Sequence, residues 1–143
     1  MNNLKIIDEI QIHKIVAYFL LAYLSYSFLV HGLSALSANP GYIILMTELG
    51  LSYAVSKVLI LIIGVFDVSV AIALFAYRKK FVVLYASVWP IFVMLGKFVS
   101  SGQLYLSYLQ YFIVGITAYM LFFHYKSIVN FSKEKLYLIK YLE

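Results

Sequence analysis

Four apolar stretches, each close to the length of a membrane-spanning helix, constrain this chain more than any other feature. They run from about residue 12 to 30, 58 to 77, 81 to 98 and 104 to 123. A helix needs about 20 apolar residues to cross a bilayer, and short connections make neighbouring helices antiparallel. The sequence therefore predicts an all-α integral membrane protein, a four-helix antiparallel bundle that forms a single transmembrane domain over residues 1–143.

The composition agrees with a membrane location. Hydrophobic residues make up 64% of the chain and charged residues 12%, whereas soluble domains have about 25% charged residues. The net charge of +5 does not indicate nucleic-acid binding, because the basic residues lie at the ends of the apolar stretches. The chain has no cysteine, which excludes disulfides, thiolate catalysis and cysteine-ligated clusters.

Two segments outside the four stretches have their own predictions. Between the first two spans, the turn Asn39-Pro40-Gly41 precedes about a dozen apolar residues that Glu48 and Gly50 interrupt. A stretch this short is typical of an interfacial or re-entrant segment. The C-terminal residues 131–143 alternate lysines with leucines, which predicts an amphipathic helix on the membrane surface, with a frayed tail as the alternative.

The distribution of positive charge predicts the orientation. Of the 11 lysine and arginine residues, all but Lys57 and Lys97 fall on one side of the predicted membrane. Positive residues concentrate in cytoplasmic segments. We therefore expect both termini and the Arg78-Lys79-Lys80 turn to be cytoplasmic.

Asp67 is the main candidate for a functional group. It lies near the middle of the second span, about 15 Å from each end at the helical rise per residue, where an ionised carboxylate is costly. Either it is neutral, or it faces the bundle and meets a hydrogen-bond donor. Gly64 and Ala71 share its side of the helix, and small residues allow close helix approach, so we expect Asp67 to face inward. It is a proton-handling or ligand-binding group, or else an interhelical clip.

A polar stripe follows the fourth span. Its members recur every seven residues, which keeps them on one helix face: Gln103, Gln110, Thr117 and His124. Because polar groups are costly against lipid, we expect this stripe to face the interior. It would line a water or ligand path, or hold the helices together.

A polar mouth is predicted at the outer level of the bundle. It would combine residues from several segments: His31, Glu48, Lys57, Lys97 and Gln103. Such a cluster above Asp67 suits an anionic or quinone-like head group; the alternative is that lipid head groups hydrate these side chains.

The third span carries Trp89-Pro90 near its centre. Proline removes a backbone hydrogen bond and kinks a helix. The kink would widen a cavity beside Asp67 with Trp89 as its wall, or serve packing alone.

Other chemistries find little support. His13 and His124 lie at similar depth, but both are interfacial and flanked by lysines, so a bis-histidine haem is disfavoured. No metal-ligand cluster, phosphate loop or nucleophile motif is evident. The sequence neither assigns nor excludes an enzymatic activity.

The stretches "LVHGLSAL" and "LIIGVFDVSVAIALFAYRKKFVVLYASVWP" resemble the DoxX-like membrane proteins. The shared features are His31-Gly32, Gly64, an acidic residue at Asp67, and a basic turn at Arg78. The resemblance covers roughly residues 15–97 and implies a four-helix membrane bundle. Here the acid is aspartate where glutamate is commoner.

The resemblance implies a link to quinone-dependent oxidoreduction, after which the family is named. We therefore expect an inner-membrane subunit or accessory of a quinone-linked redox system, in contact with lipid and with other membrane subunits or copies of itself. A small-solute or proton transporter, and a structural assembly subunit, are the alternatives. The candidate binding residues are Asp67, His31, Lys57, Lys97, Gln103, Gln110 and Trp89, with a quinone as the compatible ligand.

Overall fold

The structure of this protein is a computed structural model that describes residues 2–125, with side chains from residue 12 onward. This part of the chain forms five α-helices and one short π-helix: α1 (Asn2–Leu36), α2 (Pro40–Glu48), α3 (Tyr53–Ala76), α4 (Lys80–Ser101), α5 (Ser107–Tyr119) and η1 (Met120–His124). The predicted all-α fold is confirmed. The predicted amphipathic tail lies outside the described residues.

Three helices in the described part of the chain are long and apolar enough to cross a membrane. They are Ile12–Leu36 within α1, the whole of α3, and the whole of α4. The fourth expected span, 104–123, starts later and is divided into the 13 residues of α5 and the π-helix η1. The later start follows from Gly102, whose left-handed conformation (φ 68°) ends α4 and leads into a short loop.

The segment between α1 and α3 is a short helix, as the prediction of a non-spanning segment requires. The Asn39 side chain accepts a hydrogen bond from the Gly41 backbone N–H at 2.9 Å, and Pro40 occupies the first helical position. Asparagine caps and first-position prolines favour helix starts. The turn expected at these residues is therefore the beginning of α2.

The helix α3 begins five residues before the expected span. Ser52 caps it, because its side chain accepts a hydrogen bond from the Val55 N–H at 3.4 Å. At 1.5 Å per residue the 24 residues of α3 extend about 36 Å, and Asp67 lies within about 4 Å of the helix midpoint. The longer helix thus keeps Asp67 at a central depth.

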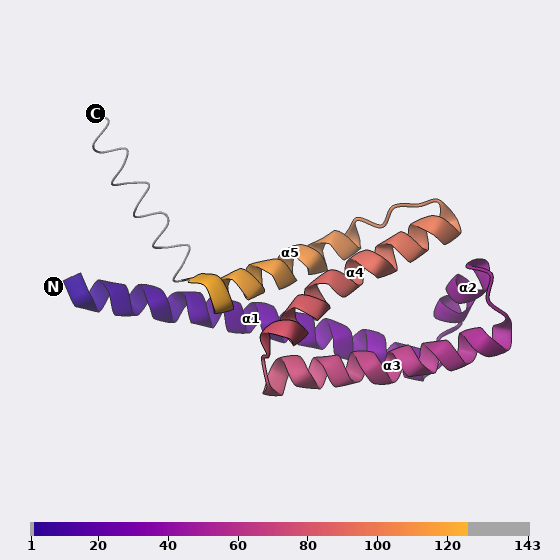
Figure 1. Ribbon diagram of the computed structural model, residues 1–143, viewed down its shortest axis with the longest axis horizontal. Coiled ribbons are helices and arrows are strands. Elements are labelled where there is room, and N and C mark those ends of the chain that lie inside the picture. Colours follow the sequence, from indigo (N-terminus) through magenta and orange to yellow (C-terminus); the bar gives the residue numbers. More distant parts are fainter. Residues whose placement is uncertain (1, 126–143) are drawn as a thin grey trace, which may run out of the picture.

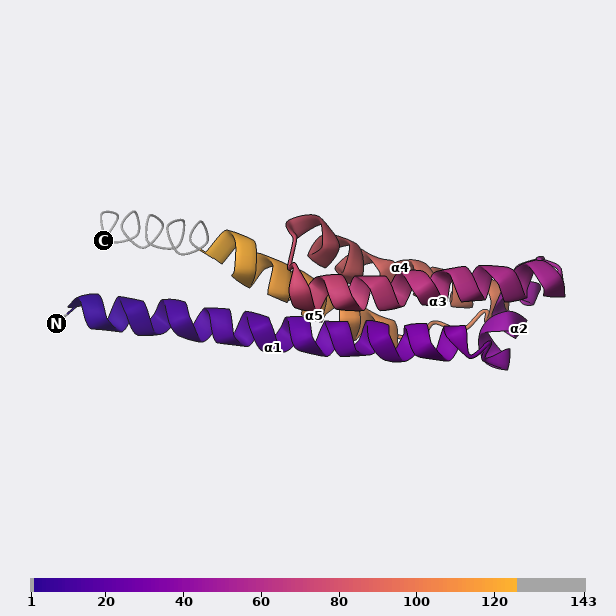
Figure 2. The ribbon, with the colours of Figure 1, turned by 90° about the horizontal axis from the view of Figure 1, so that it is seen from below.

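The long helices pack as two antiparallel pairs. Helix α1 lies beside α3 and α4 beside α5, while α2 lies at the end of the bundle opposite the N-terminus (Figure 1; Figure 2). All four long helices contribute to one core of buried residues: Leu21, Leu24, Phe28, Val70, Ala71, Leu74, Val83, Ala86 and Ala118. This core lies on the side of the Asp67 level that is nearer the α3–α4 turn.

The outward faces of the spanning helices are apolar. Only 33% of the most apolar window of α3 is buried within the chain, and outward residues such as Ile62, Val65 and Phe66 are more than half exposed. Exposed apolar surface of this extent would be unfavourable in water. The chain therefore presents these faces to the lipid bilayer.

Candidate functional site

Two glycines allow α1 and α3 to cross with their backbones in contact. A Cβ atom added at Gly64 would lie 2.9 Å from the carbonyl oxygen of Gly32, and one added at Gly32 would lie 3.0 Å from the carbonyl oxygen of Gly64. Any larger residue would separate the helices. Because His31 precedes Gly32 and Asp67 follows Gly64 by one turn, this crossing fixes both polar side chains relative to each other.

Asp67 faces the inside of the bundle, as its small neighbours predicted. Its side chain is 6% exposed, and its Oδ1 atom is buried without a hydrogen-bond partner. Buried polar atoms are almost always paired, so an unpaired carboxyl oxygen is the feature of this bundle that most needs an explanation. The unpaired oxygen argues against Asp67 acting as an interhelical clip through that atom.

Asp67 lines a cavity of about 210 Å³ to which all five α-helices contribute residues. We call it the Asp67 cavity. Most of its lining is aliphatic or aromatic, and its few polar side chains include Asp67, His31, Tyr42 and Ser27. An apolar cavity with a few convergent polar groups is typical of a small-molecule site.

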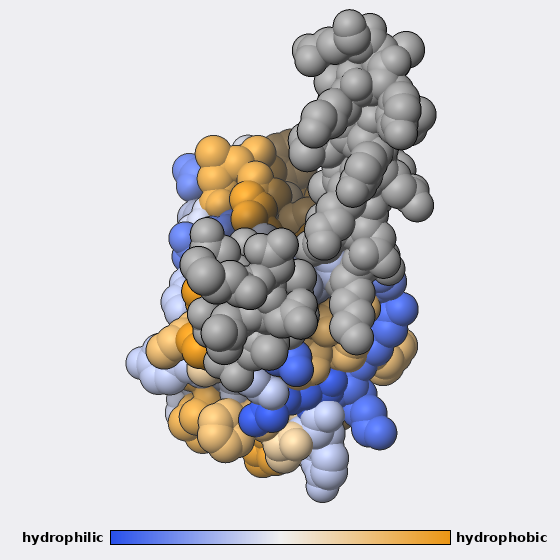
Figure 3. Space-filling view, turned by 90° about the vertical axis from the view of Figure 1, so that its left-hand side faces the viewer, coloured by the Kyte–Doolittle hydropathy of each residue, from blue (hydrophilic) through white to orange (hydrophobic). Residues whose placement is uncertain are grey.

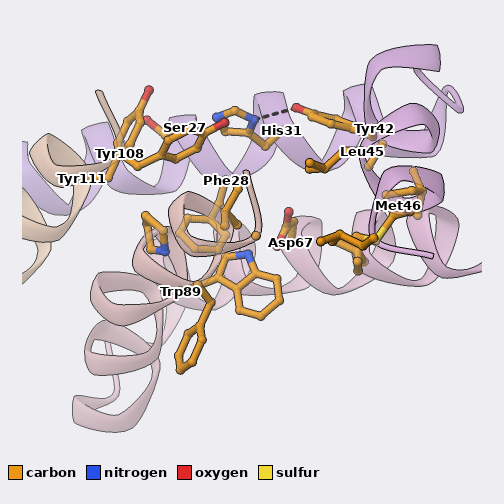
Figure 4. Close-up of a pocket in the computed structure, with 18 of the residues that line it drawn as sticks. Ser27, Phe28, His31, Tyr42, Leu45, Met46, Asp67, Trp89, Tyr108 and Tyr111 are labelled. Carbon is orange, nitrogen blue, oxygen red and sulfur yellow. Dashed lines mark hydrogen bonds between the residues drawn. The ribbon is translucent and has the colours of Figure 1, made fainter. Parts of the chain in front are cut away.

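A histidine–tyrosine pair lies across the cavity from Asp67. The His31 Nδ1 atom and the Tyr42 hydroxyl are 2.8 Å apart and share a hydrogen bond, and Figure 4 shows this pair on one side of the cavity with Asp67 and Trp89 on the other. Burial raises the pKa of Tyr42 above its ordinary value of 10.0. The tyrosine therefore stays a neutral phenol, and the pair joins α2 to α1.

Aromatic side chains form the remaining walls of the cavity. Trp89 lines it from α4, as one of the two interpretations of the Trp89-Pro90 pair expects, Pro90 lies beside it in the lining, and Tyr111 lines it from α5. The Tyr111 ring stacks on Tyr23 at 6.0 Å between centroids and meets the His31 ring edge-on at 6.3 Å. Such aromatic pairs stabilise the wall beyond the area they bury.

The predicted polar mouth forms only in part. His31 lines the cavity, whereas Glu48, Lys57 and Gln103 are exposed and do not line it. Lys97 does not line it either, but its ammonium group lies 5.2 Å from the ring centre of Tyr108, which does. The three exposed residues point away because they occupy the outward faces of α2 and α3 and the α4–α5 loop.

The prediction that the stripe on the fourth span faces the interior is wrong. Gln103, Gln110 and Thr117 are exposed. Helix α5 instead packs through Gly115 and Ala118, both buried, and Gly115 lies directly against Ser87 of α4. Two residues along a helix differ by about 200° in direction, so packing through Gly115 turns Thr117 outward. The inward side of α5 consists of Gly115 and Ala118 at the α4 contact and of Tyr108 and Tyr111 at the Asp67 cavity, and Gln110 does not line that cavity.

Sequence reasoning missed Tyr42, Tyr108 and Tyr111, because all three resemble interfacial tyrosines in a chain with 14 of them. The signal that could have found two of them is their spacing, since Tyr108 and Tyr111 are three residues apart and share a helix face. Metal binding has no candidate among the described residues, where no three histidine or acidic side chains come together.

Long apolar helices around a shared core, with a buried carboxylate at central depth, define a multi-span helical membrane protein. The profile of the DoxX-like family matches residues 25–121, which is more than half of the chain. The chain belongs to the DoxX-like family. The match extends past the resemblance seen in the sequence and includes α5. No curated protein and no solved structure matches this chain.

Proposed function

We propose that this protein binds the head group of a quinone in the Asp67 cavity, as the membrane subunit or accessory of a quinone-linked redox system. The observation that carries the proposal is the unpaired, buried Oδ1 atom of Asp67 in an apolar cavity. A protonated carboxyl group there donates a hydrogen bond to a quinone carbonyl oxygen. The His31–Tyr42 pair across the cavity offers a second polar contact to the opposite carbonyl.

The size of the cavity supports a head group rather than a whole lipid-soluble molecule. Its volume of about 210 Å³ is below the roughly 300–1,000 Å³ of typical drug-sized sites. Phe92 lines the cavity and is 61% exposed, which supports an opening of the cavity to the lipid at α4. An isoprenoid tail would leave there, into the lipid.

In this proposal the chain has two roles: it binds the quinone, and it holds a proton next to a quinone oxygen. Reduction of a quinone to a quinol takes up two electrons and two protons. The two electrons and the second proton would come from a partner subunit, and Asp67 would supply the first proton from a carboxyl oxygen next to the quinone oxygen. We also propose that both termini face the cytoplasm, on the basis of the lysine and arginine distribution.

Trp89 provides a direct assay, because it is the single tryptophan of the chain and lines the cavity. The purified protein in lipid nanodiscs is titrated with a short-tailed benzoquinone, and quenching of Trp89 fluorescence is followed. We expect saturable quenching in the wild type. Asp67→Leu should weaken binding about 5- to 150-fold, because it removes one hydrogen bond to a buried group, worth roughly 1–3 kcal/mol.

Ser69→Ala is the matched control, since Ser69 lies on the same helix, is exposed, and bonds only its own helix through the Val65 carbonyl. It should bind like the wild type. Saturable binding of equal strength in Asp67→Leu would remove Asp67 from the site. Quenching by quinone that never saturates in the wild type would refute the quinone proposal.

The transport alternative loses one of the two observations that suggested it, the inward polar stripe, because three of the four stripe residues are exposed; the other is Pro90 inside α4. It predicts proton or solute flux in proteoliposomes above that of protein-free liposomes, and a positive result there would replace the quinone proposal.

A further inference from the structure

A second hollow lies between α1 and α3, near the α3–α4 turn and away from the Asp67 cavity. It is an open groove of about 420 Å³, which we call the Arg78 groove. Its floor includes Leu21 and Leu74, both almost fully buried, and its sides are the exposed rings of Phe19 and Phe75. Apart from Arg78, every side chain that lines it is apolar or aromatic.

The groove opens toward the membrane, not toward the bundle. Phe19 is 73% exposed and Phe75 is 68% exposed, and both belong to helices that cross the membrane. In a bilayer the molecules outside such a groove are lipids.

The cationic end of the groove is held in place. The Arg78 guanidinium carbon lies 4.7 Å from the ring centre of Tyr18, and the Lys80 ammonium lies 5.6 Å from the ring centre of Tyr119. Cation–π contacts of this kind fix the position of a cation while its N–H groups remain able to donate. Arg78 also keeps a left-handed backbone (φ 47°), which is uncommon for a residue other than glycine.

The acidic side chains that the structure describes lie far from the Arg78 end of the groove. Glu48 lies on α2 at the opposite end of the bundle and Asp67 lies in its own cavity. Figure 3 looks at the end of the molecule that carries the α3–α4 turn and shows hydrophilic surface beside hydrophobic surface there. A cationic cluster at the end of an apolar groove complements a molecule with an anionic head and an apolar tail.

We propose that the Arg78 groove is a binding site for an anionic phospholipid, with the phosphate on Arg78 and one acyl chain between Phe19 and Phe75. Guanidinium groups bind phosphate oxygens through paired N–H donors, and basic pockets at helix ends select anionic lipids. The proposal does not depend on the quinone site.

The test uses native mass spectrometry of the full chain after exchange into nanodiscs that contain phosphatidylglycerol and phosphatidylcholine with identical acyl chains. The wild type should retain phosphatidylglycerol preferentially. Arg78→Gln should lower its retention about ten-fold, because it removes charge-assisted hydrogen bonds to the phosphate. Arg78→Lys should retain more lipid than Arg78→Gln because it keeps the charge.

Two further variants separate a site from general surface charge. Lys79→Gln removes a neighbouring exposed cation that does not line the groove, and it should retain phosphatidylglycerol like the wild type. Ala22→Phe fills the groove without changing charge, at an exposed lining position, and should lower retention. Equal losses in Arg78→Gln and Lys79→Gln, or full retention in Ala22→Phe, would overturn the proposal. Size-exclusion profiles establish that each variant is folded.

Discussion

The crossing of α1 and α3 at two glycines gives the sharpest stability prediction, through Gly64→Ala. The new methyl carbon would lie 2.9 Å from the Gly32 carbonyl oxygen, the Leu36 amide nitrogen and the Leu36 Cγ atom. Two of these three atoms belong to the backbone of α1 and cannot rotate away. The helices must separate by several tenths of an ångström along their whole contact.

Two opposing contributions determine how much stability Gly64→Ala loses. Overpacking of a tight interior costs about 1–3 kcal/mol, and backbone contacts favour the upper end of that range. Replacing a glycine inside a helix by alanine stabilises the helix by about 1 kcal/mol, because alanine has the higher helix propensity. We therefore expect Gly64→Ala to lose about 2 kcal/mol of stability. At roughly 3 °C per kcal/mol for a chain of this size, the melting temperature should fall by about 6 °C.

Gly96→Ala is the matched control, because it lies inside α4 and a Cβ there would meet only the Leu49 Cδ1 atom at 3.9 Å. It gains the same helix propensity without the clash, so its melting temperature should stay equal or rise by up to about 3 °C. The melting temperatures of both variants are measured by thermal unfolding in detergent, with circular dichroism as the signal. If Gly64→Ala melts no lower than Gly96→Ala, the backbone contact at this crossing is refuted.

Three further predictions follow from the described contacts. Gly115→Ala should lower the melting temperature about as much as Gly64→Ala, because its methyl carbon would lie 2.7 Å from the Ser87 Cα atom; an unchanged value would contradict the α4–α5 packing. Gln110→Leu should leave stability within about 0.5 kcal/mol in thermal unfolding, because the side chain is exposed, whereas a large loss would place it inside the bundle. Tyr42→Phe should cost about 0.5–1.5 kcal/mol of stability by removing the hydroxyl that bonds His31, and benzoquinone titration should show weaker binding than in the wild type.

The depth and direction of Asp67 were predictable from the sequence. Its position between helix ends follows from counting residues, and the small residues Gly64 and Ala71 on its side of the helix identified the packed face. The structure adds that the Gly32 backbone is the surface that Gly64 meets. Pairing of glycines on two helices depends on how the helices cross, which a single helix pattern does not contain.

The stripe on α5 shows where the same reasoning fails. A spacing of seven residues establishes that Gln103, Gln110 and Thr117 share a face, but the direction of that face depends on which neighbours compete for the inside. Gly115 fits against Ser87, and that close backbone contact prevails over the preference of three polar groups for the interior. The sequence pattern of a helix shows which residues share a face, whereas helix packing decides which way that face points.

Membrane residence, helical class and approximate spans were determined by the sequence itself, because hydrocarbon accepts only long apolar segments with a fully paired backbone. The tertiary structure alone decided which side chains meet in the Asp67 cavity. Tyr42, Tyr108 and Tyr111 come from α2 and α5 and reach His31 and Asp67 only after folding. Distances between helices depend on side-chain volumes at each crossing, and those volumes act together only in the folded bundle.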